Sequence, residues 1–595
     1  MINLEEWKHK LSVPDADVTL DGGDEELMES WNLYDLDVKC KSITIKDTKF
    51  SSNVYFNGLS LKGNIIFSNC KIKELHLNNC NLSTNESYKG GLRISDSEIT
   101  YMLDIAHCKF LHGRISIYRS SIHIFYLINS ETGEDIFIEQ SPCFHIGFNQ
   151  VKAKKIEFAN IDIKQLPFFY NSEIRLENCH AQELFFYECK LQYVWLSKLY
   201  LDNSCLIQKT TISNFNFNEP GIAFDLVCRD SNFTDQFLVS LKASKEDQSG
   251  FPMKAIRLMD SDLGKNAMIT GSLEKAHLNQ LILTGNRETS TSLDIENIAV
   301  KYASFSYENT IRTLRLMRID ICTLEIYYLQ NSGSIYFSTV RPYGDNTVWS
   351  IKHSQTGNWH LNDCSFEGLN YLDISNSDLD GLRYASVVWF KSWTLIPLEL
   401  REVADPQKQK KHLRKVFWDK FPKSNVYVTV IRRRREVYRM LKEAAENQKD
   451  RIQSLRFQQE EMNAYQQELR LTQRFYNPDR IALWAGRSNN HGLNWWKPVG
   501  LAIGISLFFY IAIVIGAEAS VSWKDIFHSA NAWKIIFSEW GLFPQLLNPV
   551  HSLEHMVRNP LAIHPLTWYF DYVHRLLMAF FIFQSVAAFR KFIKA

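Results

Sequence analysis

A period of five residues dominates the middle of the sequence. Between Ile174 and Leu201, apolar or small residues occur in pairs two positions apart, and each pair begins five residues after the one before. This period fits neither the 3.6-residue repeat of an α-helix nor the long two-residue alternation of a β-strand. The stretch IRLENCHAQELFFYECKLQYVWLSKLYL contains the pairs Ile174/Leu176, Cys179/Ala181, Leu184/Phe186, Cys189/Leu191, Val194/Leu196 and Leu199/Leu201.

The same pattern begins at Ile43/Ile45, continues to Cys108/Phe110 and returns between Trp359 and Leu379. Polar residues such as Asn, Asp and Glu often separate the pairs, as expected for corners between short extended steps. Stacked coils of such steps would bury the paired residues in one continuous column. The period therefore predicts a β-solenoid.

The pattern resembles that of the pentapeptide-repeat proteins. This resemblance implies a mainly β fold, a right-handed parallel β-helix, with an inward residue at the centre of each pentapeptide and a small residue two positions before it. The small position is often Ile, Leu or Val here, and single-residue insertions interrupt the register. A flattened cross-section is therefore as acceptable as a square one. The pattern is weakest over 205–350, where unrelated antiparallel strands are the alternative.

The cysteine content favours a reducing compartment, and the balanced charge argues against a polyanionic partner. The chain has 67 basic and 66 acidic residues, so we expect no nucleic-acid binding. Its 11 cysteines all precede residue 365, and none forms a C-x-x-C pair, so we interpret them as small core residues. The polar start MINLEEWKHK lacks the features of a secretory signal, which favours a cytoplasmic N-terminal domain.

No set of catalytic residues is evident in the predicted solenoid. Acidic residues at its corners are scattered among Asn, Lys and Ser, whereas a glycan-cleaving β-helix needs carboxylates that converge on one strip. We therefore expect no enzymatic activity, no cofactor and no metal, and a surface for binding or assembly instead. The acidic residues considered are Glu177, Glu188, Asp363 and Asp373.

After about residue 405 the composition becomes charged and typical of helices. The sequence predicts an N-terminal extension over 1–39, the solenoid over 40–390, a helical connector over 391–486 and a membrane domain over 487–595. Within the connector, apolar faces on both sides of the sequence ENQKD predict a helix hairpin over 427–475. This segment resembles a helix pair of bacterial membrane proteins with pentapeptide-like regions, and also a loose tetratricopeptide unit.

Four consecutive arginines, Arg432, Arg433, Arg434 and Arg435, span more than one helical turn and cannot form a single basic stripe. A solvated, ion-paired face is one interpretation. Attraction to anionic lipid headgroups, shared with Lys497, is the second. Contact with nucleic-acid phosphates is a more remote third.

Two segments are candidates for membrane spans. Residues 498–517 are uncharged and long enough to cross a bilayer, and Trp495, Trp496 and Lys497 precede them as an interfacial belt. Residues 571–590 form a less apolar second span that ends in RKFIKA. Basic residues at these two ends place both termini in the cytoplasm, which predicts a multi-pass protein of the bacterial inner membrane. The intervening loop would lie outside or insert partly.

Polar residues of the second span are the candidate site. Asp571 and Arg575 are four positions apart and can form an ion pair, His574 lies beside them, and Gln584 is expected at mid-depth in the membrane. A pore-lining or gating role is one interpretation. Interfacial side chains and one interhelical hydrogen bond are the other.

The sequence HSLEH, from His551 to His555, has the H-x-x-E-H spacing of an inverted zinc-protease motif. It follows NPV in a loop, and no third ligand is evident from the sequence. We therefore treat the motif as a coincidence or an interfacial turn.

The arrangement of span, loop and second span resembles the two-helix, channel-like C-termini of bacterial membrane proteins with a preceding pentapeptide-type region. It implies a homo-oligomeric channel or membrane-permeabilising pore in the lipid bilayer, with a solenoid that binds a cytoplasmic protein, for example in defence against phage. No TVGYG-type filter is present. The alternative is a passive anchor for a solenoid scaffold.

Overall fold

The computed structural model describes most of the chain as two compact units, Met1–Thr394 and Leu395–Ala595, which are treated separately below. The described residues are 4–23, 26–27, 31–32, 38, 40–82, 91–162, 173–220, 225–241, 253–271, 276–285, 289–309, 311–331, 333–355, 358–379, 381–397, 400, 425–473, 477–517, 530–553 and 565–593.

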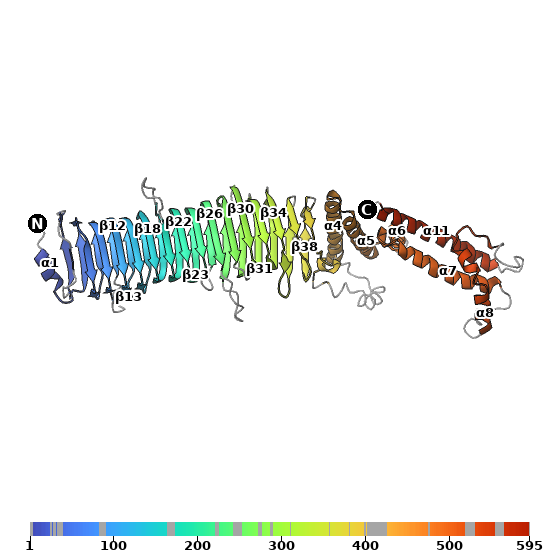
Figure 1. Ribbon diagram of the computed structural model, residues 1–595, viewed down its shortest axis with the longest axis horizontal. Coiled ribbons are helices and arrows are strands. Elements are labelled where there is room, and N and C mark those ends of the chain that lie inside the picture. The colour runs from blue at the N-terminus through green and yellow to red at the C-terminus, as the bar shows by residue number, and fades with distance from the viewer. Residues whose placement is uncertain are drawn as a thin grey trace. The chain divides into compact units, whose positions relative to one another are not determined.

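The first unit is a parallel β-solenoid of about 14 turns, as the five-residue period predicts (Figure 1). Its strands form two sheets. One sheet contains β1(Asp17–Asp21), β4(Ser42–Lys46), β7(Ser60–Leu61), β8(Ile65–Ser68), β10(Asn81–Leu82), β11(Leu92–Ser95), β13(Lys109–Phe110), β14(Ile115–Tyr118), β16(Glu131–Thr132), β17(Ile136–Glu139), β19(Lys152–Ala159), β21(His180–Tyr187), β23(Tyr200–Gln208), β25(Asp225–Arg229), β27(Met253–Met259), β29(Ala276–Thr284), β31(Ile298–Asn309), β33(Asp320–Asn331), β35(Arg341–Pro342), β36(Val348–Lys352) and β38(Tyr371–Ser375).

The other sheet contains β2(Glu26–Leu27), β3(Trp31–Asn32), β5(Lys49–Phe50), β6(Val54–Asn57), β9(Lys71–Asn78), β12(Glu98–Ala106), β15(Ser121–Ile128), β18(Cys143–Asn149), β20(Glu173–Glu177), β22(Lys190–Ser197), β24(Thr211–Asn218), β26(Asn232–Leu241), β28(Asn266–Gly271), β30(Thr289–Glu296), β32(Ile311–Met317), β34(Ser334–Ser338), β37(Trp359–Asn362) and β39(Arg383–Ala385).

Each strand pairs with the strand one turn further along the chain. In the opening stretch Ile174 lies beside Val194 and Leu184 beside Cys205, so one turn takes about 20 residues, or four five-residue units. All twelve residues of the six sequence pairs between Ile174 and Leu201 are buried. The five-residue period therefore corresponds to the positions whose side chains point inward.

The parallel pairing continues through the region where the repeat is weakest. β25 pairs with β27, β29 with β31 and β31 with β33, all in parallel register. The alternative of antiparallel strands over 205–350 is therefore wrong. Right-handed winding stays a prediction.

The solenoid begins earlier than residue 40. β1 pairs with β4, β2 with β5 and β3 with β6, so part of the expected N-terminal extension already belongs to the first coil. A short helix, α1(Leu4–Leu11), precedes this coil. Its Trp7 packs edge-on against Trp31 at 5.4 Å between ring centroids, and both side chains are buried.

Left-handed residues mark the corners between strands. Asn178, Glu188, Lys198 and Lys209 all have φ between 48° and 52°, and they recur about every ten residues, twice per turn. This conformation costs roughly 1–2 kcal/mol for a residue with a Cβ atom. Hydrogen bonds between coils hold it: the Glu188 backbone N–H donates to the Gln208 carbonyl at 3.1 Å, and Lys209 repeats the contact with Arg229 at 3.0 Å.

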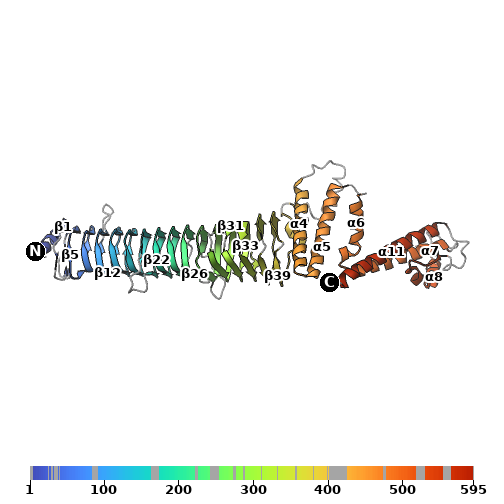
Figure 2. The same cartoon turned by 90° about the horizontal axis from the view of Figure 1, so that it is seen from above.

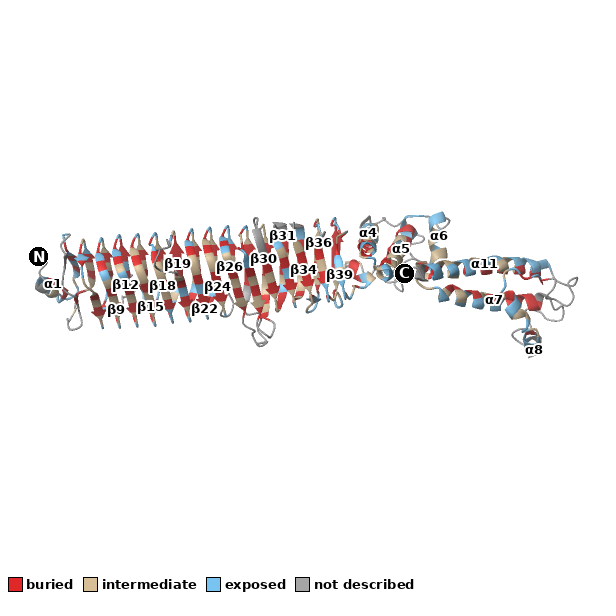
Figure 3. Cartoon of the chain, turned by 45° about the horizontal axis from the view of Figure 1, so that its top comes forward, coloured by how far each residue is buried: buried red, intermediate tan, exposed pale blue. Residues whose placement is uncertain are grey.

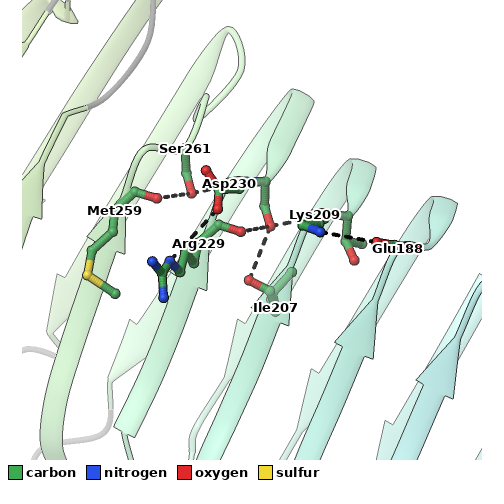
Figure 4. Close-up of polar contacts among 9 residues, drawn as sticks. Glu188, Ile207, Lys209, Arg229, Asp230, Met259 and Ser261 are labelled. Carbon is green, nitrogen blue, oxygen red and sulfur yellow. Dashed lines mark hydrogen bonds and ion pairs between the residues drawn. The ribbon is translucent and has the colours of Figure 1, made fainter.

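Inward Ser, Thr and Cys side chains follow many of these corners and form a second ladder. The Ser97 backbone N–H donates to the Ser120 hydroxyl at 3.2 Å, and the Ser120 N–H donates to the Ser141 hydroxyl at 3.1 Å. Each hydroxyl in turn donates to the carbonyl two residues before it. Figure 4 shows the region of this ladder between Glu188 and Ser261. The hydroxyls of this ladder accept hydrogen bonds from corner N–H groups that have no partner in the strand pairing.

The cysteines are free thiols, and ten of the 11 are buried in the solenoid. Burial raises the pKa of Cys143 to about 12, and the pKa of Cys179 and Cys189 to about 11. Cys322 alone is half-exposed among them. The interpretation of these residues as small core side chains is thus confirmed.

The second unit is helical. It contains α4(Asn425–Asn447), α5(Arg451–Thr472), α6(Pro478–Arg487), η2(Asn490–Gly492), α7(Trp496–Ala517), α8(Ala530–Ser538), α9(Leu542–Leu546) and α11(Pro565–Ile593), while η1(Ser392–Leu395) lies at the end of the solenoid. α4 and α5 pack side by side as a hairpin (Figure 2). Asp450 caps α5 by accepting from the Gln453 N–H at 3.1 Å. Two helices are long and apolar enough to cross a membrane, Trp496–Ile515 and Pro565–Arg590.

Replacing Ser97 with Ala tests the hydroxyl ladder. The variant removes the acceptor of the Cys70 backbone N–H, which lies 3.0 Å from the Ser97 hydroxyl. A buried N–H without a partner costs about 1–3 kcal/mol, so amide exchange at Cys70 should accelerate roughly 5- to 150-fold. Hydrogen exchange followed by mass spectrometry measures this change. The variant Ser60→Ala, at an exposed position of β7, is the control and should leave exchange unchanged.

Thiol labelling tests the burial of the cysteines. Because only Cys322 is half-exposed and burial disfavours the thiolate of several others, a maleimide should label about one thiol per native chain at neutral pH. Denaturation should raise the number to all 11. Intact-mass spectrometry gives the count, and the variant Cys322→Ser should abolish the fast labelling. Rapid modification of several cysteines in the native chain would contradict the packing described here.

Candidate functional site

α7 and α11 form an antiparallel pair. Trp495, just before α7, contacts Phe589 near the end of α11, whereas Phe509, later in α7, contacts Phe570 near the start of α11. Much of α11 is exposed in Figure 3, whereas α7 has both exposed and buried residues and is buried over its last turns. Only 22% of the most apolar window of α11 is buried within the chain.

A buried polar cluster lies between these two helices. α7 contributes Ser506 at its midpoint, and α11 contributes Asp571, His574 and Arg575. The segment that follows α9 contributes His551. Ser506 and His574 are fully buried, Asp571 is 2% exposed and His551 is 7% exposed. Spacings of three and four residues place the three α11 side chains on one face of the helix.

Asp571 is the centre of the cluster. Its Oδ1 lies 2.6 Å from His551 Nε2, and its Oδ2 lies 2.5 Å from an Arg575 guanidinium nitrogen. The other ring nitrogen of His551, Nδ1, lies 2.6 Å from the Asn548 carbonyl oxygen. The carboxylate thus has a partner on each oxygen, His551 on one and the Arg575 guanidinium on the other, as a buried charge requires.

A second set of contacts joins α11 to α7. Ser506 Oγ lies 3.0 Å from His574 Nε2 and 3.1 Å from the Met578 sulfur. His574 packs against Phe509 and against His551, with ring centroids 5.4 Å and 5.8 Å apart. Its Nδ1 atom is buried and has no hydrogen-bond partner among the residues that the structure describes.

The cluster contains the chemical groups of a metal site. One ligand atom from each of His551, Asp571 and His574 can be chosen so that all three lie within 4.8 Å of one another. Two imidazoles and one carboxylate are ligands typical of divalent transition metals. The same groups can also hold and transfer a proton. This combination makes the cluster the candidate functional site of the described residues.

Three of the four residues predicted for the second span meet in the cluster: Asp571, His574 and Arg575. Gln584 does not. Its side-chain oxygen accepts from Asn489 Nδ2 at 2.8 Å, and Asn489 precedes α7. Gln584 is therefore half-buried beside the segment that precedes α7, and its position at mid-depth in a membrane stays a prediction.

Two of the arginines proposed for lipid headgroups form ion pairs within the helical unit. Arg432 and Arg435 both bind Glu468, at 3.0 Å and 2.7 Å, across the hairpin of α4 and α5. Arg433 is half-buried and takes part in other interactions, whereas Arg434 is buried. These contacts favour the interpretation of an ion-paired face for Arg432 and Arg435, and burial excludes Arg434 from a solvated face.

Lys497 lies at the start of α7 and keeps its predicted place beside the apolar helix. Its ammonium group donates to the Arg487 carbonyl at 3.0 Å and to Asn490 Oδ1 at 2.8 Å. These bonds connect the first turn of α7 to the end of α6. Lys497 therefore has hydrogen-bond partners within the chain, and its interfacial position stays a prediction.

Sequence reasoning missed two members of the cluster. Ser506 lies within an uncharged run, where a single hydroxyl among apolar residues was its only signal. His551 belongs to the H-x-x-E-H motif, but its partners are Asp571 and His574 of α11. Glu554 and His555, the rest of the motif, lie outside the described residues.

Comparison with known proteins adds no family assignment. No protein-family model, curated protein or solved structure matches this chain.

Replacing Asp571 with Asn tests the electrostatic role of the carboxylate. The variant leaves the partly buried Arg575 without its counter-charge and changes the acceptor beside His551, which together cost about 3 kcal/mol. For a unit of this size the apparent melting temperature should fall on the order of 5–10 °C. Thermal unfolding of the purified protein in detergent measures the shift. As a control, the variant Asp479→Asn removes an exposed carboxylate of α6 and should change the melting temperature little.

Proposed function

We propose that the protein is a membrane protein in which α7 and α11 cross the bilayer and assemble with further copies of the chain into a pore. The solenoid, a degenerate relative of the pentapeptide-repeat type, lies in the cytoplasm and binds a protein partner that controls the pore. Both termini lie on the cytoplasmic side of a bacterial inner membrane.

The main evidence for the proposal is where the apolar and ionisable side chains of the α7 and α11 pair lie. Large apolar side chains cover its outside, and ionisable side chains lie within it. A soluble protein shows the opposite arrangement, because water favours polar groups outside and apolar groups in the core. The most exposed apolar residues of the two helices are Trp496, Phe508, Tyr569, Tyr572, Leu576 and Phe583.

The buried cluster favours a pore over a passive anchor. A charged side chain at mid-membrane costs free energy, and such residues in spans typically mark ion or proton pathways. A helix that only anchors a domain has no need of Asp571, His574 and Arg575. Two helices are too few to enclose a channel, so the pore requires several copies of the chain.

The solenoid supplies an extended surface for the proposed partner. Its outward side chains include ion pairs between neighbouring coils, such as Arg119 with Asp96 at 3.0 Å and Lys209 with Glu188 at 3.3 Å. Exposed pairs of this kind contribute little to stability. Mixed charges along a rigid stack of coils suit a protein partner better than a polyanion.

One observation favours the alternative of a passive scaffold anchor. The polar cluster is enclosed by the chain's own helices, whereas the exposed outer faces of α7 and α11 are mainly apolar. No polar strip for a pore is visible on those outer faces among the described residues. Under this alternative the two helices only hold the solenoid at the membrane.

Flux measurements on liposomes distinguish the two functions. Liposomes with the purified full-length protein should release an entrapped ion or small dye, and a chain in which residues 496–593 are replaced by an unrelated two-helix anchor should not. The variant Arg575→Ala should alter the flux, because it removes one of the cations beside Asp571.

The control is Arg439→Ala, at an exposed position of α4, which should leave flux at the wild-type level. Flotation of the liposomes shows that each protein has inserted. If inserted wild-type protein releases nothing, with and without cell extract as a source of the partner, the pore is wrong. Retained biological function of the anchor-exchanged chain would then identify the scaffold.

A further inference from the structure

We propose that His551, Asp571 and His574 bind a divalent transition-metal ion of the Zn²⁺ or Fe²⁺ type. This site departs from the expectation of a metal-free protein. It does not depend on whether the helices form a pore. The evidence consists of the hydrogen-bond roles of the two imidazoles, the position of the carboxylate and the burial of all three side chains.

His551 directs one ring nitrogen at the carboxylate. A carbonyl oxygen only accepts hydrogen bonds, so Nδ1 must carry the hydrogen in the 2.6 Å contact with Asn548. Nε2 then faces Asp571 Oδ1, also at 2.6 Å. A neutral imidazole would place two lone pairs against each other there. A shared proton therefore joins the two atoms at this hydrogen-bond distance, and a bound metal ion would take the place of that proton.

Ser506 occupies one ring nitrogen of His574. Its hydroxyl lies 3.0 Å from His574 Nε2 and 3.1 Å from the Met578 sulfur, so it can donate to the sulfur and accept from Nε2, which is the tautomer that a metal ion on Nδ1 requires. In this tautomer Nδ1 carries the lone pair, and this buried atom has no hydrogen-bond partner among the described residues.

The buried, unpartnered Nδ1 atom of His574 favours a metal ion over a proton alone. A proton on His551 explains the contact with Asp571 but leaves His574 Nδ1 unsatisfied, at a cost of about 1–3 kcal/mol. A metal ion would satisfy His551 Nε2, Asp571 Oδ1 and His574 Nδ1 together. The ligand atoms available from these residues, within 4.8 Å of one another, are close enough for a common ion.

The surroundings have the features of an outer shell. Metal-ligating histidines usually donate their second ring N–H to a carbonyl or another oxygen, which fixes the ring. Asn548 serves His551 in this way, and Ser506 serves His574. Arg575 binds the second oxygen of Asp571 and holds the carboxylate in place.

The donor set indicates the class of metal. Imidazole ligands suit Zn²⁺ and Fe²⁺, whereas Mg²⁺ and Ca²⁺ prefer oxygen ligands. A divalent ion, Asp571 and Arg575 together carry a net charge of about +2, so the site should favour an anionic fourth ligand such as hydroxide or chloride. The ion would fasten the segment after α9 to α11.

Metal titration of the full-length protein in detergent tests the site. After treatment with a chelator, wild-type protein should bind about one Co²⁺ per chain with visible absorption bands, and Zn²⁺ should displace it. The variants His551→Ala and His574→Ala should lower the affinity more than 100-fold. Ser506→Ala, which disturbs only the outer shell, should lower it roughly 10- to 100-fold. The control His491→Gln, in η2, should bind like wild type.

The variant His574→Cys distinguishes the loss of a metal ligand from a disturbance of the fold. A cysteine is itself a metal ligand, so this variant should retain Co²⁺ and show a new thiolate-to-metal charge-transfer band in the near ultraviolet. The proposal is overturned if wild-type protein binds no stoichiometric Co²⁺ or Zn²⁺, or if His574→Cys binds Co²⁺ without the sulfur band. Wild-type affinity in His551→Ala would also overturn it. Each of these results would mean that a proton alone explains the contact between His551 and Asp571.

Discussion

Backbone hydrogen bonds between successive parallel coils are the interaction on which the first unit depends. Because every coil must pair in register with the next, the chain has to reach the same corner after each turn, and the left-handed residues such as Asn178 and Lys198 make this return. The corner conformation opposes folding locally, while the hydrogen bonds and the inward hydroxyls of Ser97 and Ser120 favour it. The five-residue period is the sequence consequence of this repeated geometry.

The second unit depends on a different constraint. Ser506, Asp571 and His574 lie inside a helix pair whose outside is apolar, so their polar atoms depend on partners within the chain. Asp571 has His551 and Arg575, and Ser506 bridges His574 and Met578, whereas His574 Nδ1 has no hydrogen-bond partner among the described residues. Such an interior tolerates few substitutions, because the loss of one partner leaves the other buried and unsatisfied.

The sequence predicted best what depends on local spacing. Leu184, Phe186 and their equivalents were assigned inward positions because burial in a solenoid repeats every five residues, and Asp571 was paired with Arg575 because four residues make one helical turn. Contacts across long stretches of chain carry no such period. His551 reaches Asp571 over 20 residues, Ser506 reaches His574 over 68, and Gln584 meets Asn489 over 95. The α11 residues of the candidate site could therefore be predicted from the sequence, whereas the contributions of Ser506 and His551 are evident only from the tertiary structure.

The short helix α1 has a further consequence for the first coil. A parallel solenoid ends in strands whose N–H and C=O groups face no further coil, and such edges can pair with those of another molecule. Trp7 and Leu11 of α1 are buried against the beginning of the solenoid, where Trp7 meets Trp31 and the Leu11 carbonyl accepts from the Cys40 N–H at 3.3 Å. The helix thus covers part of the first coil with apolar side chains, which should disfavour end-to-end stacking of solenoids at this end.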